Sequence, residues 1–328
     1  MEKPAPIRTA ITDMFQLDYP IIGAPMFLVS NKEMVLSVSQ SGGLGTFPAL
    51  NFRPINNYEA QLKEIKSNLK DRPFGINIIV QKKNKDQERQ LEIAIENEVP
   101  LIITSLGSPK SVIEKARGTK TRVFCDVVGL KHAEKVASLG ADGLIVVGSG
   151  AGGHGGETSL FALLPFLKKH VDLPMIAAGC MSDGRSLLAA LALGADGIYM
   201  GTRLIASKEA TVSEEYKNAI IEAGSEDIVN TDRVDGFPGN FIKTKNLQDV
   251  LKPNFVDNVL SQNAKIKRTI SLLRASRALF GSPKQKLSYK NTFSAGQGVG
   301  SIDKILDIQT IVWETASGYH DCRLGLPS

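Results

Sequence analysis

Short apolar runs alternate with amphipathic segments of helical length through the first two thirds of the chain. Near-continuous apolar runs are typical of strands buried on both faces, and an apolar position every three or four residues is typical of a helix packed on one side. This alternation predicts a parallel sheet whose strands are joined by helices. Eight strands are predicted, at residues 20–23, 44–47, 74–80, 101–104, 122–127, 144–147, 175–178 and 198–201.

An internal repeat narrows the choice of fold. The sequence Leu-Gly-Ala-Asp-Gly occurs at 139–143 and again at 193–197, each time directly before a predicted strand. In both copies a helix ends at glycine and the chain turns into a buried strand. Equivalent units in a series of eight strands favour one (β/α)8 TIM barrel over two separate domains.

The alternation stops after Arg203, and this change divides the chain. Residues 204–290 are polar and helical in pattern, which predicts an inserted smaller helical domain that could act as a lid. Residues 1–203 are then the barrel. Residues 291–328 return to it, with a helix expected over 302–318.

Composition narrows the class of protein. The chain has 328 residues, of which 42% are hydrophobic and 22% charged, as expected for a globular protein with a large core. The longest apolar runs fall well short of the roughly 18 residues that span a bilayer. Three scattered cysteines, at 125, 180 and 322, suit neither a disulfide framework nor a zinc site. We therefore expect a cytoplasmic protein with no metal and no membrane contact.

Positive charge is concentrated in one stretch. The net charge is only +5, yet residues 258–302 contain eight basic side chains and no acidic one. Aromatic residues are sparse there and no nucleic-acid motif accompanies the charge, so we expect no nucleic-acid partner. A solvated helical face is the favoured interpretation. Attraction of an anionic substrate or partner remains the alternative.

The most distinctive candidate site is a glycine-rich loop after the sixth predicted strand. Residues 148–156 hold six glycines around His154. Glycine allows close approach of the backbone to a ligand, and histidine exchanges protons near neutral pH. The loop contains a G-x-G-x-x-G pattern, but the acidic residue that follows, Asp172, precedes the next strand instead of ending it, which disfavours a dinucleotide-binding unit. We predict that His154 is a catalytic base.

Small residues end the last two predicted strands. Gly179 and Cys180 follow the seventh, and Gly201 and Thr202 follow the eighth. In TIM barrels the loops at these two positions often bind phosphate through backbone N–H groups. Tight strand-to-helix turns are the alternative interpretation.

Two polar residues interrupt apolar strands. Asn77 lies within the third predicted strand and Asp126 lies near the end of the fifth. A buried polar side chain needs hydrogen-bond partners, so each is either a satisfied core residue or a cofactor contact. The turn formed by Ala24, Pro25 and Met26 after the first strand carries no chemical signal by itself.

Together these motifs resemble the nitronate monooxygenase (2-nitropropane dioxygenase) family. The similar segments run along nearly the whole chain, with the loop 151–156 the most specific; the others are 19–26, 41–45, 72–77, 181–185, 193–197, 200–203 and 294–298. The resemblance implies a TIM barrel with an added helical domain and non-covalently bound FMN. Position 180 departs from the family because Cys180 stands where glycine is usual.

The resemblance also implies roles for individual residues. His154 matches the family's catalytic histidine. The implied FMN contacts are Ala24, Pro25, Met26, Asn77, Asp126 and Gly152, with the phosphate held at Gly179, Cys180, Gly201 and Thr202.

Three functions follow as hypotheses. The first is oxidative denitrification, in which an alkyl nitronate or nitroalkane reacts with O2 to give a carbonyl compound and nitrite, with His154 as base. The second is an FMN-dependent NAD(P)H oxidoreductase of the quinone reductase or enoyl-acyl-carrier-protein reductase type, in which the same Ala-Gly-Gly-His loop occurs. The third is a flavin-binding regulator without turnover, against which His154 argues. The sequence is compatible with a homodimer but does not fix the oligomeric state.

Overall fold

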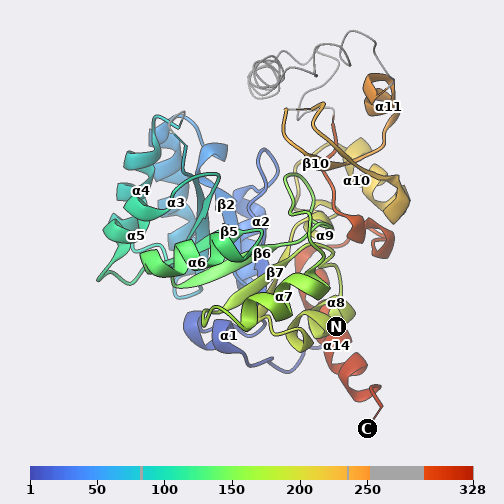
Figure 1. The fold of residues 1–328 in the computed structure, drawn as a ribbon, viewed down its shortest axis with the longest axis horizontal. Helices are drawn as coiled ribbons and strands as arrows, with labels where there is room; N and C mark the ends of the chain where they lie inside the picture. The colour runs from blue at the N-terminus through green and yellow to red at the C-terminus, as the bar shows by residue number, and fades with distance from the viewer. Residues whose placement is uncertain (82–83, 235, 252–291, 328) are drawn as a thin grey trace.

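A computed structural model describes residues 1–81, 84–234, 236–251 and 292–327. Eight parallel strands form one sheet in the order β1-β8-β7-β6-β5-β4-β3-β2 (Figure 1). Each predicted strand is present, with its ends within one residue of those expected. Their bounds are β1 Ile21–Gly23, β2 Gly45–Pro48, β3 Phe74–Ile79, β4 Leu101–Ser105, β5 Arg122–Val127, β6 Gly143–Val147, β7 Met175–Ala178 and β8 Gly197–Met200.

The two outer strands of this sheet meet and close it. The Gly23 N–H donates to the Leu44 carbonyl at 2.9 Å, and the Leu44 N–H donates to the Ile21 carbonyl at 3.0 Å. Leu44 directly precedes β2, so these bonds join β1 to β2. The predicted TIM barrel is therefore confirmed.

Helices follow the strands and cover the outside of the barrel. Their apolar faces point inward; α3, for example, buries Tyr58, Leu62, Ile65 and Leu69 at helical spacing. The bounds are α2 Lys32–Gln40, α3 Ile55–Leu69, α4 Gln87–Glu96, α5 Lys110–Ala116, α6 Leu130–Leu139, α7 Leu160–Lys168, α8 Gly184–Ala192 and α9 Thr202–Ile205, with a short helix η1 at Ala49–Asn51.

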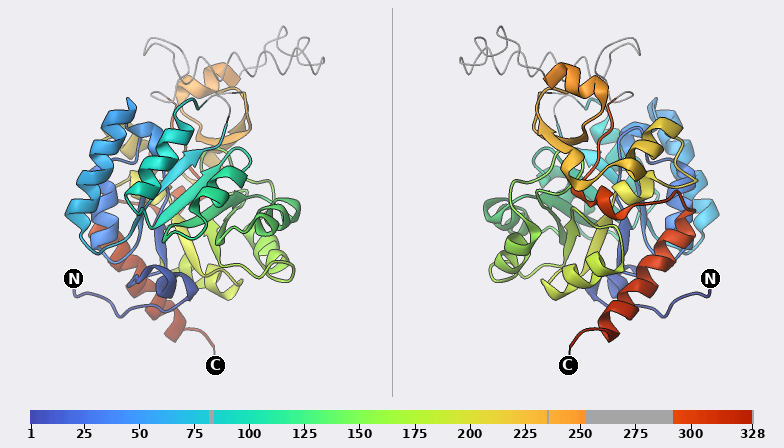
Figure 2. Two further views of the ribbon diagram at one scale, coloured as in Figure 1. Left: turned by 90° about the vertical axis from the view of Figure 1, so that its left-hand side faces the viewer. Right: turned by 90° about the vertical axis from the view of Figure 1, so that its right-hand side faces the viewer.

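Helix α1 (Ala10–Phe15) closes the end of the barrel at which the strands begin (Figure 2). Ile11 and Phe15 pack against side chains that fill the barrel interior, and the Phe15 ring lies 5.9 Å from that of Phe124 on β5. This apolar plug leaves the opposite end, where the strands finish, as the mouth that can hold a ligand.

The segment after α9 contains a β-hairpin that the helical prediction for 204–290 did not include. Helix α10 (Glu214–Glu222) and helix η2 (Ser225–Asp227) lead to β9 (Ile228–Thr231) and β10 (Gly239–Ile242), which pair antiparallel. Helix α11 follows at Lys245–Leu251. Figures 1 and 2 place the hairpin above the barrel, at the end opposite α1.

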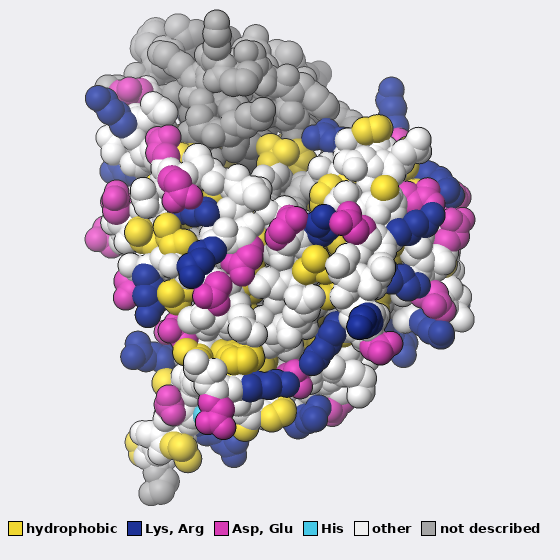
Figure 3. Space-filling model, turned by 180° about the vertical axis from the view of Figure 1, so that it is seen from behind, with side chains coloured by type: hydrophobic (Ala, Val, Ile, Leu, Met, Phe, Trp, Pro, Cys, Tyr) yellow, Lys and Arg dark blue, Asp and Glu magenta, His cyan; other side chains and the backbone are white. Residues whose placement is uncertain are grey.

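Most of the remaining predicted insertion, residues 252–291, lies outside the described residues, and so do all eight basic residues of the stretch 258–302. Elsewhere charge is mixed: Figure 3 shows acidic and basic side chains interspersed over the face seen from behind. In the part of the chain that is described, no helix combines the length and the apolar character of a membrane span.

The chain returns to the barrel through η3 (Gln297–Ser301) and α14 (Ile308–Leu324). The predicted closing helix is thus present but begins six residues later than expected, because Asp307 caps it by accepting a hydrogen bond from the Thr310 N–H at 2.8 Å. Helix α14 packs along α8, with Gly318 against Gly184.

Candidate active site at the barrel mouth

All the sequence-predicted site residues lie at the mouth. Because the strands are parallel, their C-terminal ends meet at one end of the barrel. The structure therefore brings together residues from six of the eight strands or the loops that follow them; these are Ala24, Pro25, Met26, Asn77, Asp126, Gly152, His154, Gly179, Cys180, Gly201 and Thr202.

The loop that carries His154 is fixed by the hairpin. Gly153 and Asn240 on β10 exchange backbone hydrogen bonds of 3.1 and 2.8 Å. The buried Asn240 amide also donates to the carbonyls of Ser149 at 2.9 Å and Ala151 at 2.7 Å. Four hydrogen bonds from one residue therefore set the shape of the loop after β6.

The start of η3 and the two residues before it hold the loop from another side. The Gln297 N–H donates to the Gly150 carbonyl at 3.0 Å. A Cβ at Gly152 would lie 2.9 Å from the Gly296 nitrogen and 2.9 Å from the Ala295 carbonyl carbon, which is too close for any side chain. Packing against this segment is therefore sufficient by itself to require glycine at position 152.

His154 is exposed at the top of this loop. The ring of Phe237, in the turn between β9 and β10, meets the imidazole edge-on, with centroids 6.0 Å apart and an interplanar angle of 89°. The hairpin thus supplies both the clamp on the loop and an aromatic neighbour for the histidine.

A hydrogen-bonded chain of polar side chains links three adjacent strands, β3, β4 and β5, near the mouth. The Asn77 amide donates to the Ser105 hydroxyl at 2.7 Å, and that hydroxyl donates to Oδ2 of Asp126 at 2.5 Å. Oδ1 of Asp126 is buried and has no hydrogen-bond partner among the described residues. Burial raises the pKa of Asp126 to about 6, although the Ser105 hydrogen bond opposes this shift.

Tyr199 on β8 shares this interior layer. Its pKa is raised by burial and, to a smaller extent, by the charge of Asp126, and a hydrogen bond with Thr46 opposes the shift. The Thr46 hydroxyl donates to the Gly23 carbonyl. Carboxyl, phenol, hydroxyl and amide groups therefore face one another beneath the mouth.

Backbone donors distinguish the loops after β7 and β8 from the turn after β1. Among the described residues, the N–H groups of Gly179, Cys180 and Gly201 have no protein acceptor. The Ala24 N–H instead donates to the Met200 carbonyl, and the Met26 N–H donates to Ser30. Of these five N–H groups, only those of the loops after β7 and β8 are available to an anion. Any ligand contact of Ala24 or Met26 is therefore made by other atoms.

The loop after β7 has unusual backbone angles. Gly179 has φ +125°, and a Cβ there would lie 3.0 Å from the Ala151 nitrogen. Cys180 adopts φ +58°, a left-handed conformation that glycine would tolerate better. Its Sγ lies 3.7 Å from the Gly150 carbonyl, and burial raises the pKa of the thiol. Cys180 is thus accommodated with its side chain beside the glycine-rich loop.

The loops after β8 and β1 meet beside it. A Cβ at Gly201 would lie 3.6 Å from the Ala24 Cβ and 3.7 Å from the Met26 Sδ. The Thr202 hydroxyl accepts a hydrogen bond from the Gly296 N–H at 3.0 Å, which leaves its own proton free to donate to a ligand.

Sequence reasoning missed four residues of this site. Tyr199 lies on a predicted strand and Ser105 directly follows one, but a single hydroxyl at either position gave no separate signal. Asn240 and Phe237 lie in the segment predicted as helical. They contact residues of the loop after β6 that precede them by about 90 positions in the sequence. The Asp-Gly-Phe-Pro-Gly turn signal between β9 and β10 was the one local feature that could have indicated the hairpin.

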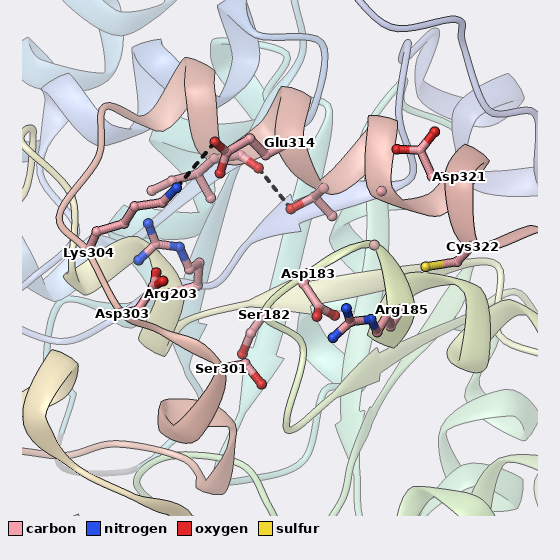
Figure 4. A pocket seen from close by; sticks show the side chains of 14 residues that line it. Ser182, Asp183, Arg185, Arg203, Ser301, Asp303, Lys304, Glu314, Asp321 and Cys322 are labelled. Carbon is pink, nitrogen blue, oxygen red and sulfur yellow. Dashed lines mark hydrogen bonds and ion pairs between the residues drawn. The ribbon is translucent and has the colours of Figure 1, made fainter.

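A separate cavity of about 360 Å³ lies on the outer side of the barrel, between α8, α14 and the segment after η3 (Figure 4). Its lining mixes both signs of charge, and Lys304 lies 3.7 Å from Glu314. Burial lowers the pKa of Arg203, and the nearby charges of Glu314 and Asp303 oppose that shift. Neither His154 nor the free N–H groups of the mouth line this cavity, so we place the chemistry at the mouth.

Comparisons with known proteins show the family to which the chain belongs. A model of the family described as nitronate monooxygenase matches residues 8–317, which confirms the resemblance. A relative from Rhodococcus jostii, named (3aS,4S,5R,7aS)-5-hydroxy-7a-methyl-1-oxo-octahydro-1H-indene-4-carboxyl-CoA dehydrogenase, is 34% identical over 238 residues, or 73% of this chain. The match spans 66% of that relative's length.

Another relative and a solved structure cover more of their own length. A probable nitronate monooxygenase from Staphylococcus saprophyticus is 28% identical over 284 residues, 73% of this chain and 79% of that protein. The structure of FabK from Thermotoga maritima superposes with a TM-score of 0.82 and 28% identity, covering 97% of this chain and 98% of that one.

Proposed function

Because the chain belongs to the nitronate monooxygenase family, a family of flavin-dependent oxidoreductase enzymes, we propose that it uses FMN to oxidise alkyl nitronates with O2 to carbonyl compounds and nitrite. The observation that carries the proposal is the placement of His154, which is held by Asn240 and Gln297 on a fixed loop at the barrel mouth. A base on a preorganised loop at this end of a TIM barrel is typical of catalysis.

The residues of the mouth fit FMN by two tests. Three backbone N–H groups, of Gly179, Cys180 and Gly201, have no acceptor among the described residues, and a phosphate would supply one. The buried Oδ1 of Asp126 lacks a donor, and a ring N–H of the flavin would supply one. We propose that Asn77 and Gly152 line the ring and that Thr202 adds a hydroxyl donor to the phosphate.

The chain's own groups would handle the proton. FMN, when bound, accepts electrons from the substrate and passes them to O2. We propose that the His154 imidazole removes the α-proton of a neutral nitroalkane, which leaves the nitronate anion beside the imidazolium. Because His154 is exposed, it can return that proton to solvent before the next turnover.

One relative favours a second candidate function. The 34% identical protein is named as a dehydrogenase of a carboxyl-CoA compound, so this chain could instead act in an FMN-dependent oxidoreduction that involves NAD(P)H. The mouth would then take a thioester, a quinone or a similar acceptor in place of the nitronate.

Anaerobic reduction of the bound flavin separates the two candidates. The cofactor would be released from a sample of the purified protein and identified as FMN. The holoprotein would then be mixed anaerobically with propyl nitronate or with NADH. Bleaching of the flavin by nitronate alone is expected. Bleaching by NADH alone would refute the proposal and favour the alternative, and no bleaching by either would favour a regulator.

Location and assembly are further predictions. We propose a cytoplasmic homodimer, which cell fractionation and sedimentation would test.

A further inference from the structure

Four large apolar side chains are exposed on the loops of the barrel mouth. They are Leu28 after β1, Leu106 after β4, Val128 after β5 and Phe237 in the turn above His154, with exposed fractions of 45%, 54%, 39% and 51%. We call these four residues the apolar rim. Single exposed apolar residues are ordinary, but a set gathered at one functional end needs an explanation.

Backbone strain sets two rim residues apart. Six non-glycine residues in the described part of the chain have positive φ. Three of them end or follow helices α1, α3 and α4, where a left-handed residue is ordinary. The other three lie at the mouth, and two of those are Leu28 and Leu106, each with φ +61°. Strained conformations that persist in exposed leucines point to function.

The loop of Leu28 is held rigidly. The Leu28 N–H donates to Oδ1 of Asn51 at 2.9 Å. The Asn51 amide then donates to the carbonyls of Met26 at 3.0 Å and Ser30 at 2.8 Å. One asparagine thus fixes the turn that projects the leucine outward.

The other rim residues are also held in place. A Cβ on Gly107 would overlap the Val80 carbonyl oxygen, so the turn after Leu106 is packed tightly against the end of β3. A Cβ on Gly156 would lie 3.4 Å from the Val128 Cβ, which places Val128 beside the loop that carries His154. Phe237 itself meets the His154 ring.

From this arrangement we infer that the site takes a substrate with an extended apolar body, a hydrocarbon chain or ring system larger than that of a short nitroalkane. The inference rests on the proposed function only in placing the reacting group beside His154. Fixed apolar groups at the entrance gain affinity because no side chain or loop has to be ordered when the ligand binds. The occupant is a small molecule, because the rim residues lie on loops of the mouth in which the reaction is proposed.

Straight-chain carboxylates from acetate to octanoate test this inference without turnover, because the carboxylate resembles the nitronate anion but does not react. Calorimetry on the FMN-loaded protein would measure the dissociation constant of each. We expect affinity to rise by up to about fourfold per added methylene, the value for full burial of a CH2 group.

Single substitutions test whether the rim residues cause this dependence of affinity on chain length. Phe237→Ala and Leu106→Ala are expected to flatten the dependence of affinity on chain length. Phe161 is an exposed phenylalanine on the outer helix α7, so Phe161→Ala should leave that dependence unchanged.

Equal affinity for acetate and octanoate would overturn the inference, and so would a chain-length dependence that both rim variants retain. A change from dimer to monomer in Phe237→Ala would assign the rim to an interface between copies instead. Failure to oxidise nitronates would refute the proposed function but leave these binding results intact.

Discussion

His154 owes its position to the backbone around it. The loop residues before it, 149–153, are hydrogen-bonded to Asn240 and Gln297, so the histidine can be replaced without removing those bonds. Its contribution to catalysis can therefore be separated from its contribution to the fold.

We expect His154→Ala to retain FMN and to lose activity on neutral nitroalkanes by about 10²- to 10⁴-fold, the usual contribution of a positioned base. Activity on preformed nitronates should fall less, since no proton has to be removed. Steady-state O2 consumption and flavin absorbance would measure both effects. His170→Ala, an exposed histidine beyond α7, is the matched control, and loss of flavin together with activity would show that His154 is structural.

We expect Asp126 to make the free energy of unfolding depend on pH. Burial raises its pKa to about 6 from an ordinary value of 3.8, so the folded protein holds the proton more tightly than the unfolded chain. The free energy of unfolding should therefore fall as pH rises from about 4 to about 6, by up to about 3 kcal/mol, and stay at the lower value above that range.

Asp126→Asn should remove this dependence, because a neutral amide has no proton to lose. Urea unfolding at pH 4.5 and 7.5 would show a smaller difference between the two pH values than in the unchanged protein. Asp71→Asn, at an exposed position, should behave like the unchanged protein. A variant as pH-dependent as the unchanged protein would exclude Asp126 as the source.

At the scale of elements, the hairpin β9–β10 shapes the active site although it lies outside the barrel. Its residue Asn240 satisfies two carbonyls of the loop after β6, while its own Oδ1 accepts from the Asn230 amide at 3.0 Å. The local pattern did not reveal these strands because each has only four residues and β10 is buried throughout. A segment of four residues is too short for its pattern to distinguish strand from helix.

We expect Asn240→Ala to loosen the loop, because the carbonyls of Ser149 and Ala151 would lose their donor. Each lost bond costs about 1–2 kcal/mol, so amide exchange across 148–156 should accelerate and FMN affinity should fall. Hydrogen-exchange mass spectrometry would follow both the loop and the rest of the barrel. Asn230→Ala removes one exposed partner and should have a much smaller effect; equal effects of the two variants would refute the proposed clamp.

At the scale of the whole molecule, α14 joins the end of the chain to the barrel by packing along α8. A Cβ at Gly184 would overlap backbone atoms of Gly318 and Tyr319, whereas a Cβ at Gly318 would lie 3.6 Å from the nearest atom of Gly184. The contact therefore needs glycine on one side only.

This asymmetry predicts opposite effects of two small changes. Gly184→Ala should lower stability by about 1–3 kcal/mol, because the helices must move apart. Gly318→Ala should leave stability unchanged or raise it by up to about 1 kcal/mol, because alanine favours the helix interior. Thermal unfolding would measure both, and equal destabilisation would show that α14 does not pack in this way.

The sequence by itself determined the barrel and the end at which its chemistry lies. Strand and helix periods are local properties, and in a parallel barrel all strand ends meet, so Asn77, Asp126, His154, Gly179 and Gly201 could be assigned to one mouth before any contact was known. Only the tertiary structure decided which groups are partnered there. The clamp by Asn240, the chain from Asn77 through Ser105 to Asp126 and the apolar rim all involve residues from different elements, and no local periodicity encodes such arrangements. The same holds for the N–H groups at the mouth that have no acceptor among the described residues.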